Sequence, residues 1–281
     1  MTRLHIAACG TSLWDNVGVD PQDLTVAEIH DDLNRAAGWF LLARDVFNGQ
    51  QEPPGRFSAE LATLTDGAPW AVDNDDRVAL LASDTDDGLA AAMLVAKRLG
   101  DVGKASGITL QDGWIPDAAG GEAPAPVTVT DGPRPVTVVR VEGLDPTIDV
   151  AFNQAIARIA YTMLRLVCGH PPSCAEPLYD QIVLHLSGGY KATIPFLLVM
   201  AEAVASLFDS TVRAVLRFEP VRGGPPGPPI EVPVRRADLT LWAVVQDHDC
   251  GHERYGPLLQ NPATRAALTL LMGALPPDRL A

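Results

Sequence analysis

Short apolar runs alternate with longer amphipathic stretches along the chain up to about residue 220. The short runs are rich in β-branched and aliphatic residues and predict strands; they cover residues 4–9, 78–82, 108–110, 136–141, 181–183 and 212–218. In the longer stretches apolar residues recur at helical spacing, and the predicted helices cover residues 21–48, 58–64, 86–99, 149–167 and 194–204. This alternation predicts an α/β fold with a Rossmann-like parallel sheet and helices on both of its faces.

Two segments rich in glycine and proline interrupt this pattern. Residues 112–135 are typical of a surface loop, and the run at 223–229 indicates a boundary. We therefore expect a Rossmann-like domain over residues 1–222 and a small C-terminal extension over 230–281 that packs on the core or on a dimer interface. The extension is expected to contain a strand at 230–234, an apolar segment at 239–245 and a helix at 262–275.

Composition narrows the class of protein and of partner. The 281 residues are 47% hydrophobic, which is enough for a sizeable core. The net charge of −14 argues against non-specific binding of duplex DNA, although a local pocket can still hold a small anion. Neither a signal peptide nor an apolar run of membrane-spanning length is evident, and the four cysteines show no paired metal spacing. We expect a cytoplasmic protein with no membrane partner.

Small and hydroxyl-bearing residues follow three of the predicted strands. The carboxyl ends of parallel strands meet at one edge of a sheet, where α/β proteins bind their ligands. Adjacent glycines and the N–H groups of a helix N-terminus admit an anion, and Lys191 adds a full positive charge. The pattern predicts an anion or nucleotide pocket, with the candidate residues Gly10, Thr11, Ser12, Ser83, Asp84, Thr85, Ser187, Gly188, Gly189, Tyr190 and Lys191.

Simpler interpretations of single residues stay open beside this one. The turn before the helix at 194–204 could present Lys191 to water only. Asp84 would repel a polyanion, so we expect it to face away or, mainly, to cap the helix that follows. His185 stands within a predicted strand and is more typical of a satisfied core histidine than of a catalytic base.

Several common motifs are absent or incomplete. No G-x-G-x-x-G follows the first strand, and Tyr190 separates Gly189 from Lys191 where a nucleoside-triphosphate loop has Gly-Lys. The acidic stretch at 247–253 could hold a metal, but its ligands crowd into one segment, so a polar surface turn is favoured. Arg165 and His170 have the R-x4-H spacing of HEPN ribonucleases, which we attribute to coincidence because no helical domain surrounds them.

The order of these motifs resembles that of the CRISPR-associated Rossmann-fold (CARF) family. The closest likeness is to the branch of archaeal stand-alone CARF proteins and ring nucleases. It spans roughly residues 1–220, and the matching pieces are residues 9–13 (CGTSL), 58–61 (SAEL), 80–85 (LLASDT) with Gly88, 138–144 and 187–191 (SGGYK). Many relatives carry Asn and Thr where this chain has His185 and Ser187, and Ser187 keeps the hydroxyl.

The resemblance implies a homodimer whose two copies line a shared pocket for a cyclic oligoadenylate, most often cyclic tetra-adenylate. It implies slow cleavage without metal or cofactor, in which a ribose 2′-OH attacks the adjacent phosphorus and leaves a 2′,3′-cyclic phosphate, ending type III CRISPR signalling. Lys191 would hold a phosphate and stabilise the phosphorane, while Ser12 would bind the scissile phosphate or orient the 2′-OH. Thr11 and the amides of Gly188 and Gly189 would complete the cradle.

Two other functions are compatible with the same residues. A non-catalytic sensor would bind the cyclic oligoadenylate and relay binding to a partner protein. An unrelated α/β enzyme would act on a phosphorylated metabolite. The C-terminal extension is too short for a HEPN domain, and Arg235 and Arg236 alone do not make a basic surface for DNA.

Overall fold

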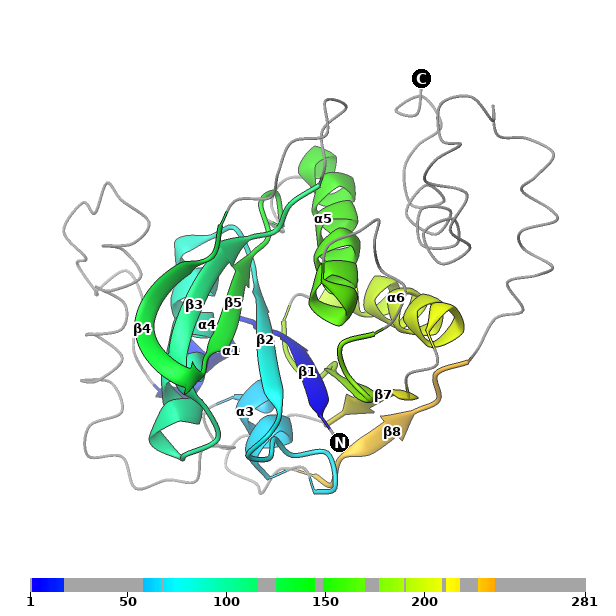
Figure 1. Cartoon of the computed structure of the whole chain (residues 1–281). Coiled ribbons are helices and arrows are strands. Elements are labelled where there is room, and N and C mark those ends of the chain that lie inside the picture. Colours follow the sequence, from blue (N-terminus) through cyan, green and yellow to red (C-terminus); the bar gives the residue numbers. More distant parts are fainter. Residues whose placement is uncertain are drawn as a thin grey trace, which may run out of the picture.

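The centre of the molecule is an eight-stranded sheet with the strand order β4-β3-β5-β2-β1-β6-β7-β8 (Figure 1). The computed structural model describes residues 2–17, 58–66, 68–115, 125–144, 149–169, 177–189, 191–208, 211–217 and 227–235. The strands are β1 (Arg3–Ala8), β2 (Arg77–Ala82), β3 (Ser106–Asp112), β4 (Val127–Arg134), β5 (Val136–Arg140), β6 (Gln181–His185), β7 (Thr211–Leu216) and β8 (Ile230–Val232). The α/β class predicted from the sequence is confirmed.

The sheet is mixed rather than purely parallel as predicted. The inner strands β3, β5, β2, β1, β6 and β7 run parallel, whereas β4 and β8 are antiparallel edge strands. Parallel strands covered on both faces are almost continuously apolar, and β1 and β2 show this pattern. The edge strands β4 and β8 contain no fully buried residue, so their apolar signal is weaker.

Strand β4 corrects the prediction of a surface loop over residues 112–135. Its proline and glycine content suggested a loop, but both are tolerated on an edge strand. Here the glycines permit a close crossing between β3 and β4: a Cβ on Gly107, whose φ is +81°, would lie 2.7 Å from the Gly132 nitrogen. The single residue Pro135 then joins β4 to β5, which pairs with the other side of β3.

Helices cover both faces of the sheet, as the alternation of elements predicted (Figure 1). They are α1 (Ser12–Val17), α3 (Ala59–Thr65), α4 (Asp86–Asp101), α5 (Asp149–Cys168) and α6 (Ile194–Leu207), with a 3-10 turn η3 (Lys191–Thr193). Helices α1, α3 and α4 share one apolar core with the sheet, and α5 and α6 share the other. Among the described residues, no helix combines the length and apolar character needed to span a membrane.

Several sequence predictions fall on residues that the structure does not describe. The predicted helix at 21–48, the apolar segment at 239–245, the helix at 262–275 and the acidic stretch at 247–253 lie outside the described residues, as does His170. The strand predicted at 230–234 is present as β8, which pairs with β7 at the edge of the sheet.

A row of hydrogen-bonded, buried polar side chains crosses the middle of the sheet. Asp76 binds Arg3 (Nη2 to Oδ2, 2.7 Å) and His5 (Nε2 to Oδ2, 3.0 Å), and Nδ1 of His5 lies 2.9 Å from Nε2 of His185. Burial alone would raise the pKa of Asp76, but the hydrogen bonds from His5 and Arg3 outweigh it and lower this pKa to about 2. Burial lowers the pKa of both histidines and so favours their neutral forms, although Asp76 opposes this shift for His5. His185 is buried in the core, as its place in a strand suggested, but it is not fully satisfied, because its Nδ1 has no hydrogen-bond partner among the described residues.

Candidate functional site

A pocket of about 620 Å³ opens at the carboxyl edge of the sheet, above β1 and beside β2 and β6. Strand β1 pairs with β2 on one side and with β6 on the other. The chain continues from β1 to β2 and from β6 to β7, so the connections after the neighbouring strands β1 and β6 lead to opposite sides of the sheet. Open α/β sheets bind ligands where their connections diverge in this way. Ala8, Leu81, Leu144, Ile159 and Leu197 give the pocket an apolar floor.

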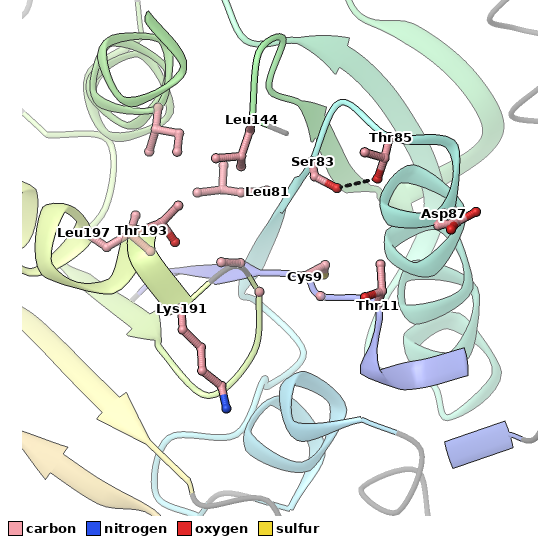
Figure 2. A pocket seen from close by; sticks show the side chains of 14 residues that line it. Cys9, Thr11, Leu81, Ser83, Thr85, Asp87, Leu144, Lys191, Thr193 and Leu197 are labelled. Carbon is pink, nitrogen blue, oxygen red and sulfur yellow. Dashed lines mark hydrogen bonds between the residues drawn. The ribbon is translucent and has the colours of Figure 1, made fainter. Parts of the chain in front are cut away.

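The structure brings six of the predicted site residues together around this pocket. They are Gly10, Thr11, Ser83, Thr85, Gly189 and Lys191. Figure 2 shows Lys191 on the opposite side of the pocket from Ser83 and Thr85, with Cys9 between them. Ser12 is the first residue of α1, directly after Thr11. Tyr190 and the side chain of Ser12 lie outside the described residues.

Three other predicted residues do not line the pocket and have structural partners. The hydroxyl of Ser187 accepts a hydrogen bond from the backbone N–H of Arg217 (2.7 Å) and is buried. Gly188 lies against the carboxyl group of Glu60. The carboxylate of Asp84 accepts from the backbone N–H of Gly143 (3.0 Å) and so ties the end of β2 to the turn after β5.

Thr85, rather than Asp84, caps helix α4. The expectation of an Asp84 cap is wrong, because the Thr85 hydroxyl accepts from the backbone N–H of Gly88 (3.2 Å) and Asp84 is engaged elsewhere. Ser83 Oγ lies 3.0 Å from Thr85 Oγ1, so a hydroxyl pair stands over the N-terminus of α4 (Figure 2). A Cβ on Gly88 would lie 1.8 Å from Ser83 Oγ, and Gly88 thus leaves the space that this hydroxyl fills.

The substitution Thr85→Ala is expected to lower the free energy of unfolding by about 1 kcal/mol, because it leaves an N–H group of α4 without its cap. Thr85→Ser should retain most of the stability, since serine is an equally good cap. Urea unfolding curves of the two variants make the comparison. Equal losses in both would contradict the assignment of the hydroxyl as the cap.

Lys191 carries the positive charge of the pocket. It stands on the 3-10 turn η3, three residues before α6, in the turn that the sequence placed ahead of this helix. Its side chain is exposed, and within the described part of the chain it forms no ion pair. A pocket lined by one exposed lysine, by hydroxyl-bearing residues on its other side and by apolar residues suits a ligand with an anionic group and an uncharged body.

The buried carboxyl group of Glu60 was not anticipated as part of the site. Its Oε1 accepts hydrogen bonds from the backbone N–H groups of Gly10 (2.7 Å) and Gly189 (3.2 Å). The Gly189 amide was expected to bind a phosphate, but in the structure it donates to this internal carboxyl group. Burial raises the pKa of Glu60, and the hydrogen bonds from Gly10, Ser58 and Gly189 oppose this shift only in part.

Other lining residues were also missed by reasoning from sequence. Asp87 and Thr193 are also among the lining residues, as is Cys9, a buried free cysteine whose thiol pKa is raised by burial. A local signal existed for Thr193, which follows Lys191 by two residues, and for Cys9, which precedes the Gly10 turn. No such signal marks the residues of the apolar floor, because Ile159 and Leu197 look like ordinary core positions of helices.

These features define an α/β protein with a ligand pocket at the carboxyl edge of its sheet. No protein-family model matches the sequence, and no curated protein matches it either. The family likeness therefore rests on the motifs and their order.

Proposed function

We propose that the chain binds a cyclic oligoadenylate, such as cyclic tetra-adenylate, at this pocket and cleaves it slowly without a metal. The observation that supports the proposal best is the placement of Lys191 opposite the hydroxyls of Thr11, Ser83 and Thr85 around an apolar floor. An ammonium and hydroxyls bind phosphates, while the apolar floor suits the uncharged parts of a nucleotide. The motif order of the CARF family points to the cyclic ligand.

The proposed site is shared by two copies of the chain. A ligand with twofold symmetry fits a twofold interface, on which each copy presents the same residues. The proposed assembly is therefore a homodimer of Rossmann-like domains, with the segment beyond β8 as an extension on the core or the interface. A monomer that binds the ligand would contradict this part of the proposal.

The proposed reaction needs positioning more than acid–base chemistry. A ribose 2′-OH attacks the adjacent phosphorus, the bond from phosphorus to the 5′ oxygen breaks, and the proton of the 2′-OH ends on that 5′ oxygen. The products are linear, with a 2′,3′-cyclic phosphate at one end and a 5′-OH at the other. Lys191 is proposed to stabilise the charge on the phosphorane, and Ser12, at the start of α1, to bind the scissile phosphate.

The substitution Lys191→Ala is expected to slow cleavage of cyclic tetra-adenylate by on the order of 100-fold, because it removes the charge that stabilises the transition state. Lys104→Ala is the matched control: Lys104 precedes β3 at the opposite edge of the sheet, and its loss should leave the rate unchanged. The measurement is chromatography of metal-free reactions under single-turnover conditions. Unchanged cleavage by Lys191→Ala would overturn the catalytic assignment.

One observation favours a sensor as the second candidate. The amides of Gly10 and Gly189 already donate to Glu60, so fewer N–H groups are left to stabilise developing charge. Intact cyclic tetra-adenylate that co-elutes with the protein would identify a sensor. Linear di-adenylate with a 2′,3′-cyclic phosphate would identify a ring nuclease.

A further inference from the structure

One buried carboxyl oxygen connects the two turns that form the mouth of the pocket. Glu60 lies on α3, is 1% exposed, and does not line the pocket itself. Its Oε1 accepts from Gly10, after β1, and from Gly189, after β6, and both of these glycines do line the pocket. Thr11 follows the first glycine, and Lys191 stands two residues beyond the second. The carboxyl group thus sits between the two segments that carry the hydroxyl and the ammonium.

The space around Glu60 is fitted to this arrangement. A Cβ on Gly188 would lie 1.9 Å from Oε1 of Glu60 and 2.0 Å from its carboxyl carbon. The backbone of Gly188 is not in the left-handed region, so its conformation admits alanine, and the three atoms nearest to the added Cβ all belong to the Glu60 side chain. A Cβ on Gly10 would lie 3.0 Å from the Gly189 nitrogen, which shows how closely the two turns approach.

We propose that Glu60 is a positioning residue of the pocket, whose carboxyl group holds the turn after β1 against the turn after β6 and so sets the place of Thr11 relative to Lys191. The two donors are the backbone N–H groups of Gly10 and Gly189, which follow the neighbouring parallel strands β1 and β6. Both residues lie beyond the last residue pair of the β1–β6 ladder. No strand pairing continues there, so a bridging side chain takes over the function of the ladder. Only the ligand measurement below rests on the proposed function.

A double-mutant cycle tests the contact without any ligand. Gly188→Ala and Glu60→Ala are each expected to lower the melting temperature by about 5 °C, since each removes the two hydrogen bonds. In the Glu60→Ala background, Gly188→Ala should add no further loss, because the three atoms that lie nearest to the added methyl group are then gone. In the Glu60→Gln background it should cost as much as in the natural chain. Additive losses in the double variant would overturn the proposal.

Hydrogen exchange tests the position of the two turns directly. The amides of Gly10 and Gly189 should exchange at least about tenfold faster in Glu60→Ala, because their acceptor is gone. Glu60→Gln should keep slow exchange, since the glutamine carbonyl oxygen can accept the two hydrogen bonds that Oε1 of Glu60 accepts. Unchanged exchange in Glu60→Ala would show that the carboxyl group does not hold the turns. If that variant does not fold, Gly188→Ala provides the same comparison, because its methyl group displaces the carboxyl group.

Ligand binding separates positioning from stability alone. Leu64→Ala is the control, because Leu64 is fully buried one helical turn from Glu60 and takes no part in the hydrogen bonds of the two turns. Glu60→Ala should bind cyclic tetra-adenylate about tenfold more weakly than the natural chain, and Glu60→Gln and Leu64→Ala should bind it as the natural chain does. Natural affinity in Glu60→Ala would reduce the residue to a structural role. If the natural chain does not bind this probe, the proposed function fails, while the cycle and the exchange rates still decide whether Glu60 holds the turns.

Discussion

Replacing Gly189 by alanine is expected to lower the free energy of unfolding by about 3 kcal/mol, the larger part of it from crowding. Gly189 has a φ of +80°, where a residue with a Cβ is disfavoured, and its Cβ would lie 2.6 Å from the Cβ of Ala8 and 3.0 Å from the Ala8 carbonyl carbon. Backbone atoms of a central strand cannot move aside. The same displacement would shift Lys191, so ligand binding should weaken as well.

Gly103 offers a matched control for this substitution. Its φ is +72°, but apart from its own chain neighbours no atom of the described residues lies within 4 Å of the place of a Cβ. Gly103→Ala therefore carries only the conformational cost, about 1 kcal/mol. Chemical unfolding of both variants gives the difference, which measures the crowding at the pocket. Equal losses at the two positions would show that the β1 and β6 turns are not packed as described.

The substitution Asp76→Asn is expected to lower the free energy of unfolding by about 3 kcal/mol at pH 7, because Arg3 and His5 lose their charged partner in a buried site. Asp112→Asn is the control, since Asp112 binds Arg140 in a pair that is partly exposed and should cost less than about 1 kcal/mol. Urea unfolding at fixed ionic strength compares the two. A loss of unfolding free energy in Asp76→Asn as small as that in Asp112→Asn would contradict a structural role for this row of buried polar side chains.

The same site predicts a particular dependence on pH. The pKa of Asp76 falls from 3.8 to about 2 on folding, so its contribution to stability is present above pH 3.8 and is lost as the pH falls towards 2. This pKa shift corresponds to a contribution of about 2 kcal/mol to the free energy of unfolding at neutral pH. The gap between the natural chain and Asp76→Asn should therefore shrink between pH 5 and pH 2. A constant gap over this range would mean that Asp76 is not charged in the fold.

Local sequence was sufficient for the inner strands and for helices α3, α4, α5 and α6, whereas the short helix α1 was not predicted. The apolar runs in β1, β2 and β6 are nearly continuous because both faces of the sheet are covered, and this signal needs no knowledge of distant residues. Strand β4 was missed because an edge strand tolerates the glycine and proline that otherwise mark a loop. The turns after β1, β2 and β6 were also found, since parallel strands place their carboxyl ends at one edge.

The partners within the site could not be predicted, because they are set by long-range packing. Nothing near Glu60 in the sequence indicates that its carboxyl group reaches Gly10, 50 residues away, and Gly189, 129 residues away. The same holds for Ser187, whose hydroxyl is engaged by Arg217, and for Asp84, which binds Gly143 instead of capping α4. The residue types predicted that these groups would form polar contacts. Which partner each group contacts is decided by the fold.

The position of β1 in the sheet has a consequence for the newly synthesised chain. His5 and His185 are 180 residues apart, and β1 has β6 as its neighbour on one side. At roughly 5–20 residues per second, a ribosome needs on the order of 10–40 s to synthesise the chain between them. Throughout that time β1 lacks one of its two neighbouring strands, and the hydrogen-bonding edge that β6 will pair with stays open. The turn after β6, with Gly189 and Lys191, is made later still, so the pocket cannot be completed until most of the chain has been synthesised.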